Sequence, residues 1–156
     1  MRKSLYLCSV VIALLGIAAS AQSQTEYELA HQKEESERRA TVAANVPLLE
    51  SEADAFWNLY LEYRAADKKM DDQRANLMLS LAESYEDLTE DEGTGLVIDA
   101  LELEEQRQLL RKSFFEKFAE VLPGQRLFLY YQIETKLDAK KRHEWTGFIP
   151  LVPVSE

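Results

Sequence analysis

The most regular hydrophobic pattern in the chain runs from Leu96 to Leu122. Apolar side chains recur there at steps of three and four residues, which places them on one face of an α-helix. These positions are Leu96, Ala100, Leu103, Leu110, Phe114, Phe118 and Val121. One position of the stripe, Arg107, is charged, and the opposite face is rich in Glu, Lys and Arg. Such a helix depends for its stability on a partner that covers the apolar face.

A second stretch, Leu48–Leu88, has the same periodicity. Its stripe is formed by Phe56, Tyr60, Tyr63, Met70, Leu77, Leu81 and Leu88. Asp67 and Arg74 interrupt this stripe, as Arg107 interrupts the other. Two interpretations are open for these three residues. Long charged side chains can extend from a seam to reach water, or oppositely charged groups can pair across the two helices and fix their register.

Residues 86–95 are predicted to form the turn between these helices. Thr89 can cap the following helix, and Glu92, three residues later, completes a capping box. The acidic residues around Thr89 are typical of a helix start. They lack the alternating ligand spacing of a calcium loop. A third helix begins near Pro123, since proline suits the first turn of a helix.

The third helix is expected to reach about His143 and to stop at Gly147, and no stretch shows the alternation of a strand. We therefore predict an all-α fold, a long antiparallel helical hairpin with additional shorter helices and an extended C-terminal tail. The predicted organisation is a signal peptide over 1–21, a polar leader segment over 22–46, a helical domain over 47–147 and an apolar C-terminal tail over 148–156.

The first residues have the pattern of a secretory signal peptide. A basic start at Arg2 and Lys3 precedes an apolar run, and Ala19-Ser20-Ala21 then offers small residues for cleavage. The alternative is a retained membrane anchor, but the apolar run is shorter than the roughly 20 residues that a spanning helix needs. The sequence thus predicts export to the periplasm and a chain free of the membrane after cleavage.

Cleavage changes both the cysteine content and the charge. The only cysteine, Cys8, lies in the signal peptide, so a disulfide scaffold and a thiol nucleophile are not expected. Without Arg2 and Lys3, 16 basic residues face 28 acidic ones, a net charge of −12. Nucleic acid is therefore not an expected partner, because its phosphates require Lys and Arg.

The sequence contains no catalytic constellation. Its two histidines, His31 and His143, lie far apart and lack the ligand spacing of a zinc site. Glu134 has no second acid or nucleophile beside it in the sequence, and a packing salt bridge explains it more simply. We expect a protein without enzymatic activity, cofactor or bound metal.

Aromatic residues are the remaining unusual feature. Most are expected in the core, but thin helical hairpins cannot bury aromatic rings on every face. The alternative is a partner surface or dimer seam, for which the candidates are Trp57, Tyr60, Phe115, Tyr130 and Phe148. A homodimer is one arrangement that such a surface allows.

Two short motifs resemble those of the periplasmic Spy/CpxP-type (LTxxQ) proteins. Leu88-Thr89-Glu90-Asp91-Glu92 is similar to the first motif, with Glu92 in place of glutamine. Leu122-Pro123-Gly124-Gln125-Arg126 resembles the second, with Pro123 in place of threonine and Arg126 in place of glutamine. The resemblance covers about 48–143 and implies a cradle-shaped dimer that acts as an ATP-independent chaperone or envelope-stress sensor. The strong acidity departs from the basic concave surface of that family.

The segments 131–137 and 149–152 are also similar to a group of uncharacterised secreted bacterial helical proteins. Two functions follow from these patterns. One is a periplasmic binding protein that holds unfolded envelope proteins or senses envelope stress. The other is a structural or adaptor protein that binds one fixed envelope partner or itself.

Overall fold

The computed structural model describes residues 25–147 and 151–153. Within these ranges the chain forms four helices and no strand, which confirms the all-α prediction. The helices span residues 25–45, then α2 (Glu50–Ser84), α3 (Glu90–Val121) and α4 (Gly124–Thr146). The chain divides into two compact units, Met1–Asn45 and Val46–Glu156, and each is described by itself.

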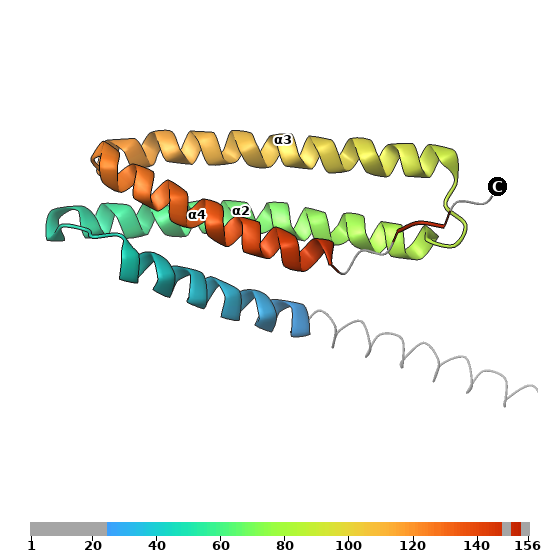
Figure 1. The fold of residues 1–156 in the computed structure, drawn as a ribbon, viewed down its shortest axis with the longest axis horizontal. Helices are drawn as coiled ribbons and strands as arrows, with labels where there is room; N and C mark the ends of the chain where they lie inside the picture. The colour runs from blue at the N-terminus through green and yellow to red at the C-terminus, as the bar shows by residue number, and fades with distance from the viewer. Residues whose placement is uncertain (1–24, 148–150, 154–156) are drawn as a thin grey trace, which may run out of the picture. The chain divides into compact units, whose positions relative to one another are not determined.

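The second unit is built from α2, α3 and α4. Figure 1 shows α2 and α3 running in opposite directions along one another, with α4 turning back from the end of α3. The α2 and α3 backbones approach closely, and so do those of α3 and α4. Long side chains connect α4 to α2, including a paired contact of Arg126 with Glu52 in which Nη2 donates to Oε1 over 2.7 Å. The hairpin is thus completed by a third helix rather than left open.

A capping box determines where α3 begins. The Thr89 backbone N–H donates to the Glu92 carboxylate over 3.0 Å, and the Glu92 N–H donates to the Thr89 hydroxyl over 3.3 Å. This confirms the predicted capping box. The hydrogen bonds from Thr89 hold the pKa of Glu92 below its usual value. Because of this cap, α3 begins at Glu90, earlier than the apolar stripe at Leu96 indicates, and includes Gly93.

The other helix ends lie within a few residues of the predicted positions. α2 ends at Ser84, before Leu88. Pro123 is the residue immediately before α4 rather than in its first turn, and its carbonyl accepts the N–H of Leu127 over 2.9 Å. A proline suits either position, since neither needs its missing N–H.

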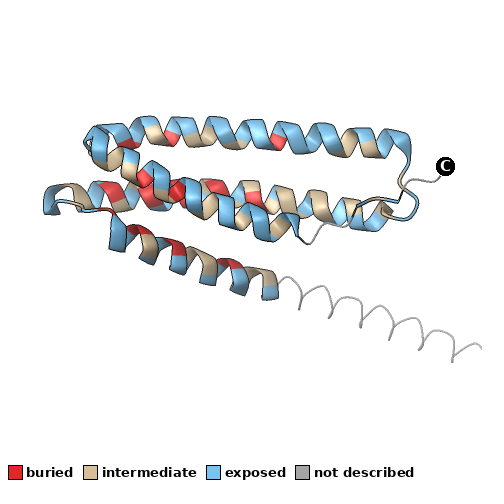
Figure 2. Cartoon of the chain, viewed as in Figure 1, coloured by how far each residue is buried: buried red, intermediate tan, exposed pale blue. Residues whose placement is uncertain are grey.

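An aromatic core joins the three helices near one end of the unit. The ring of Phe118 lies 5.4 Å from that of Phe56 and 4.8 Å from that of Tyr130, measured between centroids. All three side chains are fully buried. Tyr60 and Tyr63 extend this core along α2, and Figure 2 shows the buried segments of the three helices converging there. Edge-to-face and tilted ring pairs of this kind add stability beyond the area that they bury.

Two residues proposed for a partner surface are in this core instead. Tyr60 is 1% exposed and Tyr130 is 0% exposed. The partner-surface alternative is therefore wrong for both, because α4 packs its Tyr130 between α2 and α3 and covers the rings that a two-helix hairpin would leave open. Phe148, a third candidate, lies outside the described residues.

The helix at residues 25–45 makes local contacts along its own length. The Thr41 hydroxyl donates to the Glu37 carbonyl over 2.8 Å, and the Asn45 side chain donates to the Thr41 carbonyl over 2.7 Å. The helix ends two residues before Pro47.

The described part of the C-terminal tail is non-helical. The Tyr85 hydroxyl donates to the Leu151 carbonyl over 2.8 Å, while the Leu151 side chain is 93% exposed. Across residues 25–147 and 151–153, none of the helices combines the length and the apolar character that crossing a bilayer requires.

The aromatic core predicts that two phenylalanine substitutions change the free energy of unfolding by different amounts. Phe118→Ala is expected to lower the free energy of unfolding by about 3–5 kcal/mol, because it leaves a cavity among packed rings. Phe128→Ala, the matched control at an exposed position, is expected to change it by about 0.5 kcal/mol or less. Urea unfolding followed by circular dichroism measures both. Equal losses in the two variants would contradict this core.

Candidate functional site

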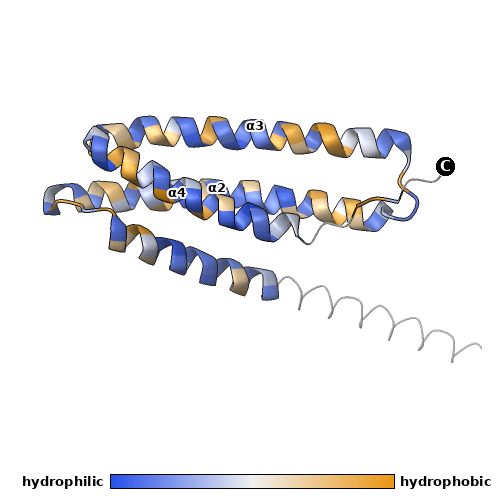
Figure 3. Ribbon diagram, viewed as in Figure 1, coloured by the Kyte–Doolittle hydropathy of each residue, from blue (hydrophilic) through white to orange (hydrophobic). Residues whose placement is uncertain are grey.

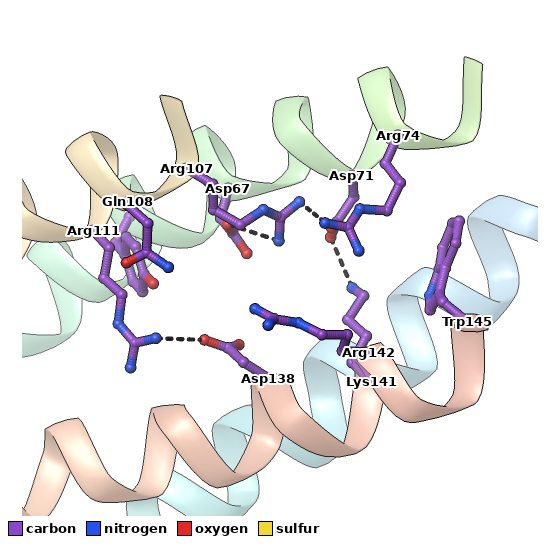
Figure 4. Close-up of a pocket in the computed structure, with 11 residues that line it drawn as sticks. Asp67, Asp71, Arg74, Arg107, Gln108, Arg111, Asp138, Lys141, Arg142 and Trp145 are labelled. Carbon is purple, nitrogen blue, oxygen red and sulfur yellow. Dashed lines mark hydrogen bonds and ion pairs between the residues drawn. The ribbon is translucent and has the colours of Figure 1, made fainter. Parts of the chain in front are cut away.

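A charged cleft lies beside the aromatic core, where α2, α3 and α4 face one another. Figure 4 shows its lining side chains pointing toward a common space. α2 contributes Tyr63, Asp67, Asp71 and Arg74, α3 contributes Arg107, Gln108 and Arg111, and α4 contributes Asp138, Lys141, Arg142 and Trp145. The central cavity has a volume of about 30 Å³, which is room for one or two water molecules.

Asp71 lies at the centre of the cleft and contacts both other helices. Its Oδ1 accepts from Arg107 Nη2 over 2.7 Å, and its Oδ2 accepts from Lys141 Nζ over 2.7 Å. Asp71 is 3% exposed. Burial by itself raises the pKa of this carboxyl, but the positive charges of Lys141 and Arg107 outweigh burial, so its pKa lies below the usual value. The carboxylate is therefore held in its charged form between two cations.

Asp67 extends this network by one helical turn. Its Oδ1 lies 3.3 Å from Arg107 Nη1, and its Oδ2 accepts from Arg64 Nη1 over 2.9 Å. Burial lowers the pKa of Arg107, but the negative charges of Asp67 and Asp71 raise it by more than burial lowers it. The pKa of Arg107 therefore lies above its usual value. The structure thus brings Asp67 and Arg107 together as a cross-helix ion pair, one of the two arrangements open from the sequence.

Arg74, the third charged seam residue, forms no ion pair with any residue that the structure describes. It is half-buried in the wall of the cleft. Burial, and next the positive charge of Arg107, lower the pKa of its guanidinium, while Glu104 and Asp71 act in the opposite direction. Asp67 and Arg107 are therefore paired, and Arg74 is not.

Arg111 and Asp138 close the other end of the cleft. Arg111 Nη1 donates to Asp138 Oδ2 over 3.3 Å, and Nη2 donates to the Thr135 hydroxyl over 2.7 Å. The guanidinium also lies over the ring of Tyr131, 4.9 Å from its centroid. Arg111 thus connects the charged cleft to an aromatic surface.

This aromatic surface is formed by Phe115, Phe128 and Tyr131, together with the Arg111 guanidinium; we call it the aromatic ladder. The rings of Phe128 and Tyr131 are stacked with centroids 6.2 Å apart, and the ring of Phe115 meets that of Tyr131 edge-on at 5.6 Å. Phe128 is 59% exposed and Tyr131 is 43% exposed. Phe115 was a predicted partner-surface residue, whereas Phe128 and Tyr131 were not.

Trp57 and the residues of the two motifs lie outside both the charged cleft and the aromatic ladder. Trp57 is half-buried at the edge of the core, with its ring 5.1 Å from that of Phe56. Leu88, Thr89 and Glu92 lie at the turn before α3, whereas Leu122, Pro123 and Gln125 follow its other end. α3 has 32 residues, which is about 48 Å of helix. The structure therefore places the two motifs at opposite ends of the unit.

The sequence pattern does not reveal the residues that hold α4 in place. Asp71 is one position after the stripe residue Met70, Lys141 is within the basic run 140–142, and Arg126 pairs with Glu52. A carboxylate next to an apolar stripe and a cation in a basic run are ordinary surface patterns, so neither signals a buried pair. In the described ranges, no three His, Cys, Asp or Glu side chains are grouped as a metal site requires.

The depressed pKa of Asp71 predicts a pH dependence of stability. A carboxyl whose pKa is lower in the folded state contributes stability that is present above its unfolded pKa, about 3.9, and is lost as pH falls through the folded value. Asp71→Asn is expected to lower the free energy of unfolding at pH 7 by about 1–3 kcal/mol and to flatten its decline between pH 5 and pH 2.

Asp99→Asn is the matched control, because Asp99 is exposed on α3. Urea titrations at a series of pH values measure the slope for each variant. An unchanged slope in Asp71→Asn would show that this carboxylate is not held between its two cations.

Comparisons of the chain with protein-family models, with curated proteins and with solved structures found no match.

Proposed function

We propose that this chain is an exported, non-enzymatic helical protein that binds other proteins of the bacterial envelope, as a chaperone-like or stress-sensing component of the periplasm. The signal-peptide pattern of residues 1–21 supports export. The motif resemblance at 88–92 and 122–126 supports a chaperone-like role. The aromatic ladder is the single structural observation on which the proposal depends.

The composition of the aromatic ladder is that of a protein-binding surface. Phe, Tyr and Arg are enriched in the centres of interfaces, where they provide most of the binding free energy. Phe128 and Tyr131 are exposed and stacked against each other, so their orientation is fixed before a partner arrives. A rigid, ring-lined surface loses little conformational entropy when it binds an apolar segment.

A second apolar surface follows the outer side of α3. Val97, Ile98, Leu101 and Leu109 are each at least half exposed. At 3.6 residues per turn they fall within about a third of the helix circumference, away from the buried side of Leu103. Figure 3 shows the hydrophobic segments of α3 separated by polar ones. Glutamates interrupt this surface, which suits transient rather than permanent contact.

Client binding is tested with the exported protein and a denatured client that aggregates. Suppression of light scattering is expected, and the double variant F128S/Y131S is expected to bind the client about tenfold or more weakly, since an aromatic anchor contributes more than about 1 kcal/mol. The control is Leu79→Ser, which removes an exposed apolar side chain from α2. A loss equal to that of the control, or no suppression by the native sequence, would exclude the aromatic ladder as a client surface.

The exposed tail favours a second candidate, an adaptor with one fixed partner. The Tyr85 hydroxyl holds the Leu151 carbonyl, while the Leu151 side chain faces solvent. A photo-crosslinking residue at position 128, used in living cells, separates the two functions. Many different attached proteins would support the chaperone-like role, and one predominant protein would support the adaptor.

A further inference from the structure

We propose that the charged cleft is a binding site for a small oxyanion with the chemistry of a phosphate dianion, held by Arg74 and Arg142. This inference is independent of the proposed protein-binding surface. It rests on the charge balance of the cleft, on the positions of its two unpaired guanidinium groups and on its unused hydrogen-bond donors.

The charges that line the cleft do not cancel. Three carboxylates are paired: Asp67 and Asp71 with Arg107, Asp71 also with Lys141, and Asp138 with Arg111. Five cationic side chains line the same cleft, so two positive charges remain without a carboxylate. These belong to Arg74 and Arg142, for which no ion pair is found within the described ranges. A local excess of two positive charges is notable in a chain with a net charge of −10.

The two unpaired guanidinium groups enter the cleft from facing walls. Arg74 extends from α2 and Arg142 from α4, on either side of the Asp71–Lys141 pair (Figure 4). Burial is the largest cause that lowers the pKa of Arg74, and the positive charges of Arg107 and, to a smaller extent, of Arg142 lower it further. Glu104 and Asp71 offset this effect only in part. An anion bound between the two walls would offset these positive charges.

The available donors favour an oxyanion. Each guanidinium presents a planar fork of N–H groups that matches the oxygens of phosphate or carboxylate in a bidentate geometry. Two further donors, Nε of Arg107 and Nε of Arg111, are buried and find no acceptor among the described residues. A tetrahedral dianion matches both the charge excess and the number of donors better than a single carboxylate does.

The size of the cavity limits the ligand. About 30 Å³ of space holds one or two waters, so a small ion or the terminal group of a larger molecule fits only by displacing them. Arg142 is exposed, so a ligand can reach its guanidinium from solvent. The phosphate group can come from free inorganic phosphate or from a phospholipid head group, and the experiment distinguishes the two sources.

Binding is measured with Trp145, which lines the cleft. The chain has two tryptophans, so the conservative variant Trp57→Phe leaves Trp145 as the only one. Titration of this protein with inorganic phosphate at constant ionic strength is expected to change the fluorescence in a saturable manner, while chloride has no such effect. Calorimetry on the native sequence checks that Trp57→Phe has not created the response.

Arg74→Gln and Arg142→Gln are each expected to weaken phosphate binding about tenfold or more, because each removes a charged hydrogen-bond donor. In the absence of phosphate and at low salt, Arg74→Gln is expected to raise the melting temperature, because the charge of Arg74 is partly desolvated and lies near the positive charge of Arg107. Lys112→Gln is the matched control, since Lys112 is an exposed cation outside the cleft. A gain in unliganded stability together with a loss of affinity also distinguishes the site from a variant that fails to fold.

Three results would overturn the proposal: neither a saturable response to free phosphate nor binding to phosphate-bearing vesicles, an equal loss of affinity in Lys112→Gln, or unchanged binding in both arginine variants. Vesicles containing phosphatidic acid, whose head group is a phosphomonoester that can carry two negative charges, provide the second arm. Binding to vesicles through Arg74 and Arg142 without a response to free phosphate assigns the head group as the source. A response to free phosphate without binding to vesicles assigns inorganic phosphate as the ligand.

Discussion

The three-helix unit depends on the buried carboxylate of Asp71. It accepts hydrogen bonds from Arg107 on α3 and from Lys141 on α4, and so connects all three helices at one point. The backbone of α4 lies close to that of α3, whereas α4 contacts α2 only through long side chains. A buried charge with two cationic partners specifies register strongly, because a shift of α4 would withdraw Lys141 and leave the buried Asp71 carboxylate with only one of its two cations.

The need to pair buried charges also explains how an apolar core and a polar cleft coexist in one three-helix unit. The rings of Phe56, Phe118 and Tyr130 exclude water at one end and provide apolar stabilisation. Farther along the helices, charged residues fill most of the space between them and leave a small cavity. Arg111 is at the boundary between the two regions and pairs with Asp138 while it covers the Tyr131 ring. Apolar burial thus provides most of the stability, and the ion pairs define which helix faces meet.

Sequence periodicity predicts the two long helices because the apolar residues of each repeat on one face, and Phe56 and Tyr63 of α2 and Phe114 and Phe118 of α3 are indeed buried. It does not predict how the third helix docks. α2 has neighbours on two sides, so its buried face is wider than one stripe and includes Asp71 beside Met70. For this reason the sequence alone leaves Tyr60 and Tyr130 as surface candidates, whereas the packing of α4 buries both. Only the assembled helices distinguish Lys141, which is paired, from Arg142, whose guanidinium forms no ion pair in the described ranges.

A double-mutant cycle between Asp71 and Lys141 tests this account most directly. The free energy of unfolding is measured in urea for the native sequence, for Asp71→Ala, for Lys141→Ala and for the double variant. The structure predicts a coupling free energy of about 1 kcal/mol or more, because Lys141 donates a charged hydrogen bond to the buried Asp71 carboxylate. A coupling near zero would mean that α4 does not dock on α2 through this pair, and would contradict the arrangement of the three helices.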